Sequence, residues 1–162
     1  MQLTHDFFDA SSFYTCQPLT DGLVLAAQER LGRRLPEAYL QLLRLRNGGK
    51  PKRRCFQAKF RTSWAADHFE IEAILGIGEP RGIDSAGPFF SSALISEWGY
   101  PNIGLVICAM PSGGHDAVML DYRDGHGEPT VAYVDEDRSA RTVARSFQDF
   151  IDRLVDCRDT AK

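Results

Sequence analysis

Residues 35–49, with the sequence LPEAYLQLLRLRNGG, describe a helix whose two ends are both encoded in the sequence. Pro36 suits the first helical turn, where its missing N–H costs no hydrogen bond. Asn47 and the two glycines after it tolerate left-handed backbone, so they predict the end of the helix. Between these ends, apolar residues recur at spacings of three and four, which predicts one buried stripe: Leu35, Ala38, Tyr39, Leu42 and Leu43.

The length and composition fit a single globular domain over residues 1–162. With 162 residues, 43% of them hydrophobic, the chain can bury a stable core without disulfides or bound metal ions. We expect the core to span residues 20–155, after an aromatic-rich arm at 1–19 and before a short, frayed tail at 156–162. No run approaches the roughly 18 apolar residues of a membrane helix, and the first residues do not resemble a signal peptide. These features predict a cytoplasmic protein.

Periodicity outside the opening stretch predicts further helices at 20–31, 89–98 and 146–155. Thr20 and Ser146 are the expected N-caps, and Gly32 is the expected end of the first of these helices. Strands are predicted at 55–61, 69–77, 103–110, 116–122 and 130–134. We therefore expect an α+β fold, with a single, mainly antiparallel twisted sheet of about five to six strands and helices packed against it.

The four cysteines predict ordinary thiols rather than a metal or redox site. They are widely spaced, and no CxxC pair occurs among Cys16, Cys55, Cys108 and Cys157. Free cysteine packs as a small hydrophobe. Cys108 lies in the apolar run IGLVICAM and is expected in the core.

Three stretches, in this order, resemble the SUKH superfamily. The first is the helix with LP, Tyr39 and the closing NGG. The second is EWGYPNIGLVICAMPSGGHDAVMLDYR at 97–123, and the third joins a short strand with Val131 to SFQDFIDRL at 146–154. The resemblance covers about residues 20–155. It implies a binding protein, because the bacterial members are largely immunity proteins and the founding member is a yeast regulator of cell-wall synthesis.

An enzymatic reading rests on five acid-base groups within a dozen residues: His115, Asp116, Asp121, Asp124 and His126. Residues five apart on one strand point to opposite faces, so Asp116 and Asp121 do not converge there. The glycine-rich turn PSGGH lacks the lysine and following helix of a P-loop. We therefore predict no catalytic residues, no metal site and no cofactor, and a metal-assisted hydrolase remains the weakest alternative.

Charge is unevenly distributed along the chain. Residues 1–61 hold 11 Lys and Arg against 5 Asp and Glu, a net +6, whereas residues 62–162 hold 8 against 17, a net −9. Opposed charges of this kind steer a charged partner. The candidate contact residues combine an acidic turn, an exposed tryptophan, the solvated face of a strand and a basic loop: Asp135, Glu136, Asp137, Trp64, Glu70, Glu72, Lys50, Arg53 and Arg54.

The resemblance and the charge pattern together favour one functional hypothesis. It is a non-catalytic bacterial immunity protein that binds and neutralises a cognate toxin in the cytoplasm, where the toxin of such relatives is often a nuclease. The alternative is a regulatory domain that binds other cytoplasmic proteins. Neither hypothesis involves direct nucleic-acid binding or a membrane, because the chain is acidic overall and its basic loop lacks interleaved aromatic residues.

Overall fold

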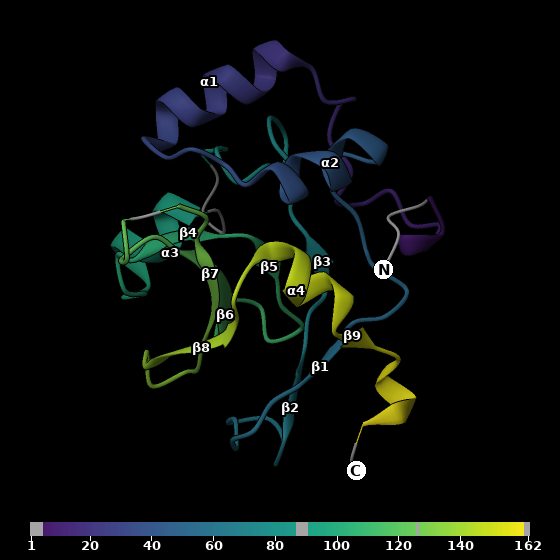
Figure 1. Cartoon of the computed structure of the whole chain (residues 1–162), viewed down its shortest axis with the longest axis vertical. Helices are drawn as coiled ribbons and strands as arrows, with labels where there is room; N and C mark the ends of the chain where they lie inside the picture. The colour runs from purple at the N-terminus through teal and green to yellow at the C-terminus, as the bar shows by residue number, and fades with distance from the viewer. Residues whose placement is uncertain (1–4, 87–90, 126, 161–162) are drawn as a thin grey trace.

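The computed structural model describes residues 5–86, 91–125 and 127–160 as an α+β domain (Figure 1). The helices are η1 (His5–Phe7), α1 (Asp21–Leu31), α2 (Glu37–Leu45), α3 (Ser91–Glu97), α4 (Phe147–Asp152) and η2 (Cys157–Asp159). The strands are β1 (Cys55–Gln57), β2 (His68–Glu70), β3 (Ala73–Ile74), β4 (Gly104–Val106), β5 (Cys108–Ala109), β6 (Ala117–Asp121), β7 (Thr130–Val134), β8 (Ala140–Ala144) and β9 (Leu154–Val155). Within these ranges, no helix is long and apolar enough to cross a membrane.

The strands form three antiparallel sheets, so the prediction of a single sheet was wrong. The strand orders are β2-β1-β9, β3-β5 and β4-β6-β7-β8. The apolar run at 103–110 divides because β4 pairs with β6 whereas β5 pairs with β3. Between β4 and β5, Ile107 donates its N–H to the Val118 carbonyl and accepts from the Leu75 N–H. One predicted strand therefore serves two sheets, and the run at 69–77 divides in the same way into β2 and β3.

Local capping signals predicted the starts of α1 and α4 correctly, but α4 ends at Asp152, and Leu154–Val155, which were predicted as helix, form β9. The Thr20 hydroxyl accepts a hydrogen bond from the Leu23 N–H at the start of α1, and Gly32 ends that helix with a φ of 64°. The Ser146 hydroxyl accepts from the Asp149 N–H at the start of α4. These contacts satisfy backbone groups that a helix end leaves without partners. The predicted start of α3 at Phe89 lies outside the described residues.

Strand β8 and the order of the tail were not predicted. The side chains of β8 are mostly exposed or half-buried, because it is the edge strand of the four-stranded sheet, and its sequence ARTVA carries a weak apolar signal. The tail is not frayed over its described residues. β9 pairs with β1, and η2 follows it directly. At the other end, Phe7 and Phe8 of the arm are buried, whereas Phe13 is exposed.

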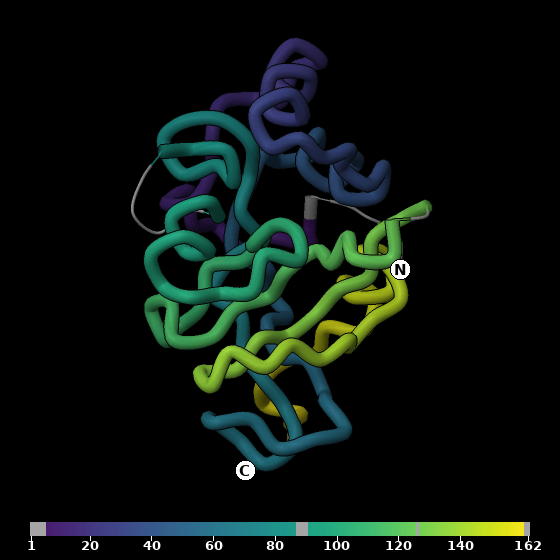
Figure 2. Tube along the Cα trace, turned by 90° about the vertical axis from the view of Figure 1, so that its left-hand side faces the viewer, coloured from purple at the N-terminus to yellow at the C-terminus, as the bar shows by residue number. Residues whose placement is uncertain are grey.

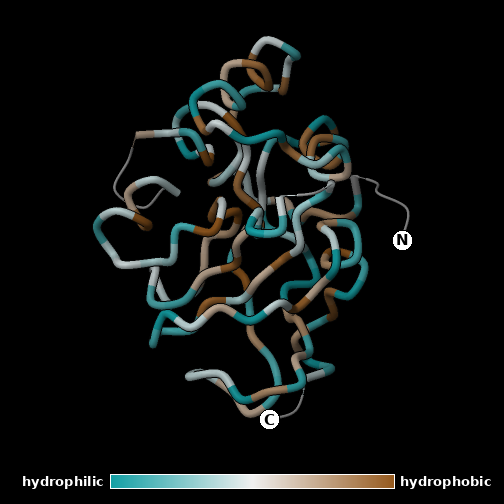
Figure 3. Tube along the Cα trace, turned by 60° about the vertical axis from the view of Figure 1, so that its left-hand side comes forward, coloured by the Kyte–Doolittle hydropathy of each residue, from teal (hydrophilic) through white to brown (hydrophobic). Residues whose placement is uncertain are grey.

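A chain of aromatic rings joins the sheets to α4 in the core. The ring of Phe56 stacks on those of Phe69 and Phe150, with both centroid distances at 5.2 Å. Phe69 in turn stacks on Tyr133 of β7 at 4.3 Å. Hydrophobic segments accordingly run through the middle of the molecule, while hydrophilic segments form much of the outer loops (Figure 3). These contacts position β1 and β2 against the four-stranded sheet.

Helix α2 begins and ends differently from the prediction. Pro36 is the N-cap rather than a residue of the first turn, and the helix ends at Leu45. Asn47 does not cap the helix. Its buried amide Nδ2 donates to the Gln17 carbonyl at 2.7 Å and to the Ile77 carbonyl at 2.8 Å, while its Oδ1 accepts from the Ile77 N–H at 2.8 Å. The residue joins the end of α2 to two distant segments.

Replacement of Asn47 by alanine should therefore destabilise the fold strongly. The buried N–H and C=O of Ile77 would lose their partner, and each buried polar group left unpaired costs about 1 to 3 kcal/mol. We expect a loss of roughly 2 to 5 kcal/mol in the free energy of unfolding, measured by urea denaturation. Asn102→Ala, at an exposed position, is the matched control. Equal stability of the two variants would contradict the structural role of Asn47.

Candidate partner-binding face

Trp64 lies in a turn that the buried side chain of Thr62 holds in place. The Thr62 hydroxyl accepts from the backbone N–H groups of Trp64 at 3.2 Å and Ala65 at 3.1 Å. It also lies 3.2 Å from the His68 carbonyl, to which it donates. Trp64 itself remains 51% exposed. The turn thus presents a large aromatic side chain to solvent from a fixed backbone.

The acidic turn at Asp135 is attached to the Trp64 turn. The Asp135 carboxylate accepts from the Ser63 N–H at 2.9 Å, across 72 positions of the sequence. The two loops lie side by side, one between β1 and β2 and the other between β7 and β8 (Figure 1; Figure 2). Hydrogen bonds from Ser139 hold the pKa of Asp137 below its ordinary value, so this carboxylate is charged at neutral pH. The turn therefore places negative charge beside the exposed indole.

Two arginines next to the acidic turn, Arg138 and Arg141, are engaged by the protein itself, whereas Lys59 and Arg61 of the β1–β2 loop are exposed. Arg138 donates to the carbonyls of Trp98 at 3.0 Å and His115 at 3.1 Å, and its guanidinium lies 4.1 Å from the centroid of the Tyr100 ring. Arg141 covers the Phe60 ring at 4.8 Å. The side chains of Glu136 and Asp137 are exposed, and Arg141 lies within electrostatic reach of Asp137. The acidic turn thus presents two exposed carboxylates to solvent.

A cavity of about 320 Å³ lies beside Trp64. Its lining includes His68 and Glu70 of β2, together with Ser112 and Asp116 at the start of β6. The structure thereby brings together five of the predicted contact residues, which we call the acidic–aromatic face: Trp64, Glu70, Asp135, Glu136 and Asp137.

Asp116 forms the polar floor of this cavity. Its carboxylate accepts from the Tyr133 hydroxyl and the Ser112 hydroxyl, both at 2.6 Å. Burial raises the pKa of Asp116 above its ordinary value, and the two hydrogen bonds oppose that effect. The residue is therefore committed to a buried network, which explains its position without a catalytic role.

The remaining predicted contact residues lie in ion pairs or close to opposite charge. Lys50 and Glu72 form an ion pair at 2.6 Å. Arg54 lies 3.7 Å from the Asp9 carboxylate, and exposed Arg53 lies within electrostatic reach of Asp156. The positive charge of the basic loop is thus partly compensated within the molecule.

The acid-base groups of the hydrolase alternative are dispersed where the structure describes them. Asp116 is hydrogen-bonded in the buried network, whereas Asp121 accepts from the Arg123 guanidinium at 2.7 Å. His115 and Asp124 are exposed, and His126 lies outside the described residues. Among the described residues of this stretch, no nucleophile, base and orienting group come together.

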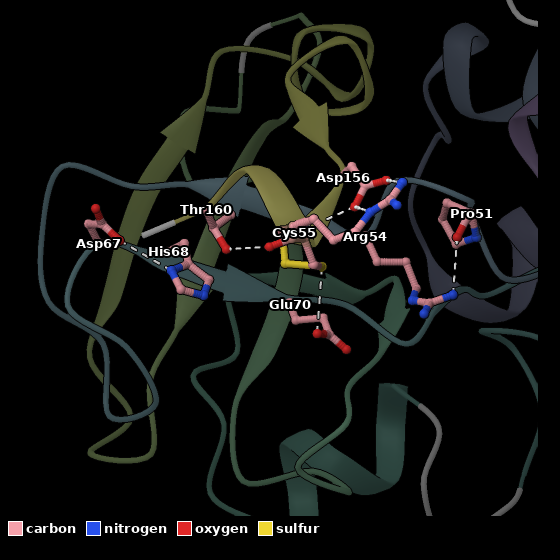
Figure 4. The surroundings of a disulfide bond; sticks show 10 residues. Pro51, Arg54, Cys55, Asp67, His68, Glu70, Asp156 and Thr160 are labelled. Atoms are coloured by element: carbon pink, nitrogen blue, oxygen red, sulfur yellow. Dashed lines mark hydrogen bonds and ion pairs between the residues drawn. A yellow bond between two sulfur atoms is a disulfide. The ribbon is translucent and has the colours of Figure 1, made fainter. Parts of the chain in front are cut away.

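The prediction of four free thiols was wrong for two of them. Cys55 and Cys157 form a disulfide across 102 residues (Figure 4). Cys16 and Cys108 are free and buried. Closing a loop of this length stabilises a fold by about 4 to 5 kcal/mol in the chain-entropy model. Pairing across so long a separation depends on β1 and β9 meeting in one sheet, which no local sequence signal reports.

Comparison with protein families gives one match. The model of the SMI1 / KNR4 family (SUKH-1) matches residues 18–153. The search of the curated proteins and the search of the solved structures found no match. The matched range contains both loops of the acidic–aromatic face and stops before Cys157.

Tyr133→Phe tests the network under the cavity. Loss of the hydroxyl removes a hydrogen bond that lowers the pKa of Asp116, so that pKa should rise further. When the pKa of a carboxyl is higher in the folded state than in the unfolded state, the folded state gains stability at pH values below the unfolded-state pKa. This gain is lost as the pH rises through the folded-state pKa. The variant should therefore lose about 1 to 3 kcal/mol at neutral pH and less in acid. Urea denaturation across pH measures this, and an equal loss at every pH would contradict it.

Proposed function

Because the chain belongs to the SMI1/KNR4 family (SUKH-1), we propose that it is a bacterial immunity protein that binds a cognate protein toxin in the cytoplasm and neutralises it without catalysis. The family is known for immunity proteins of polymorphic toxin systems. The observation that supports the proposal for this chain is the acidic–aromatic face, where an exposed tryptophan adjoins a turn with exposed carboxylates.

Trp64 is the expected source of affinity. Among the described residues, the large hydrophobic side chains that are exposed are Phe13, Leu25 and Trp64. The Phe13 ring is covered by the Arg81 guanidinium at 4.0 Å, and Leu25 lies on α1. Trp64 alone of the three adjoins both a cavity and an acidic turn. Tryptophan in such a setting is the residue type most often found to dominate binding energy.

The acidic turn is the expected source of fast and selective association. Exposed carboxylates attract a partner whose surface is basic, and they raise the association rate more than the final affinity. A toxin that cleaves nucleic acid carries such a basic surface around its phosphate-binding site. We therefore infer that a nuclease toxin is the partner class and that the face covers its substrate-binding surface.

Binding measurements with a candidate toxin encoded by a neighbouring gene test the proposal. Trp64→Ala should weaken binding by about 30-fold or more, equivalent to about 2 kcal/mol. Leu25→Ala is the matched control, because it removes another exposed apolar side chain, from α1, and it should leave the affinity unchanged. The double variant Glu136→Gln, Asp137→Asn should slow association and reduce its salt dependence, with a smaller effect on dissociation.

Co-expression gives the cellular counterpart of these measurements. Cells that produce the toxin should grow when this protein is present and stop growing when it carries Trp64→Ala. Growth arrest despite the wild-type protein would refute the pairing. If the Leu25 and Trp64 variants weakened toxin binding equally, the acidic–aromatic face would not be the binding surface. That result would not contradict the immunity role.

A further inference from the structure

Three potential metal ligands meet on the outer side of the β2-β1-β9 sheet (Figure 4). They are the two sulfur atoms of the Cys55–Cys157 disulfide and the carboxylate of Glu70. One oxygen of Glu70 lies 3.6 Å from the sulfur of Cys157, and the three ligand atoms lie within 4.8 Å of one another. An oxidised sulfur has no proton to donate, so the disulfide state leaves this carboxylate without a hydrogen bond from Cys157.

Strand pairing holds Cys55 beside Glu70 independently of the disulfide, and Cys157 follows the paired strand β9 by two residues. Cys55 of β1 is directly opposite Glu70 of β2 on one side and Val155 of β9 on the other. Side chains directly opposite in an antiparallel pair share one face. The neighbouring residues Phe56 and Phe69 point to the other face, where their rings stack in the core. The backbone around Cys55 and Glu70 is thus anchored by the core, whereas Cys157 lies in η2, which has no buried residues.

We propose that the reduced form of this cysteine pair, together with Glu70, binds a zinc ion. Thiolate and carboxylate are established zinc ligands, and tetrahedral zinc with ordinary bond lengths places two sulfurs about 3.8 Å apart and a sulfur and an oxygen about 3.5 Å apart. The contact between Glu70 and Cys157 already has this spacing. Only the two sulfurs must separate, which breaking their bond permits. A water molecule takes the fourth position.

The disulfide and the zinc site exclude each other because they use the same two sulfur atoms. A phosphine reductant supplies two electrons to the S–S bond, takes an oxygen atom from water to become the phosphine oxide, and leaves two thiols. Zinc then binds the two sulfurs as their protons pass to solvent. In a compartment that keeps thiols reduced, the thiol form is the one present. The inference concerns the isolated protein and does not rest on toxin binding.

Zinc titration of the isolated, full-length protein tests the site. After reduction with tris(2-carboxyethyl)phosphine and removal of the reagent under anaerobic conditions, the wild type should bind one equivalent of Zn²⁺ in competition with a chromophoric chelator. The oxidised wild type should bind none at the site. With Co²⁺ as the probe, the reduced protein should show thiolate-to-metal charge-transfer absorption. Cys157→Ser should abolish that absorption, and Glu70→Gln should weaken Zn²⁺ binding at least tenfold.

Two controls separate the site from other thiols and carboxylates. Cys16→Ser removes a buried thiol elsewhere, and Glu128→Gln removes an exposed carboxylate between β6 and β7; both should bind zinc like the wild type. The oxidised and reduced wild-type proteins share one sequence, so their comparison does not depend on whether a variant folds. The proposal is overturned if the phosphine does not open the disulfide in the native protein, if the reduced wild type binds no zinc, or if Cys157→Ser binds it as tightly.

Discussion

The buried amide of Asn47 is the constraint on which the arrangement of this domain depends. A buried amide must find hydrogen-bonding partners, and those of Asn47 come from Gln17 in the arm and from both backbone groups of Ile77. The backbones approach so closely that a side chain on Gly76 would lie 2.3 Å from the Asn47 carbonyl oxygen. Gly48 meets the same segment with a φ of 96°. The NGG sequence therefore marks where the helical layer is joined to the sheets.

Features that depend on neighbouring residues were predicted well, and features that depend on distant pairing were not. The caps at Thr20 and Ser146 involve residues three apart, so the sequence shows them directly. The division of residues 103–110 depends on which strands meet them, and their apolar composition is the same for one sheet or two. The role of Asn47 was misjudged for a related reason, because its type suits a helix end as well as a buried junction.

The acidic–aromatic face shows the same difference between local features, which were predicted, and distant contacts, which were not. Trp64 and the acidic residues were each predicted from composition and surroundings, as an aromatic in a polar segment and as a charged turn. Their proximity rests on the bond between Ser63 and Asp135, which depends on how two hairpin loops pack. Lys50 and Glu72 were also proposed as contacts, yet they pair with each other, since opposite charges that fold into proximity neutralise one another. A single sequence shows which residues are charged, but it does not show which of them remain free to contact a partner after folding.

The bond between Cys55 and Cys157 makes a closed covalent ring of most of the chain, with only the arm, α1 and α2 before it and the last residues after it. A protease that cuts once inside this ring, for example at the exposed turn around Trp64, leaves both products attached to each other. The cut molecule keeps its mass until the sulfurs are reduced. Whether the two products of a cut inside the ring stay joined therefore depends on the redox state of the surroundings. A single cut before the ring, in contrast, can release the segment that carries the two helices α1 and α2.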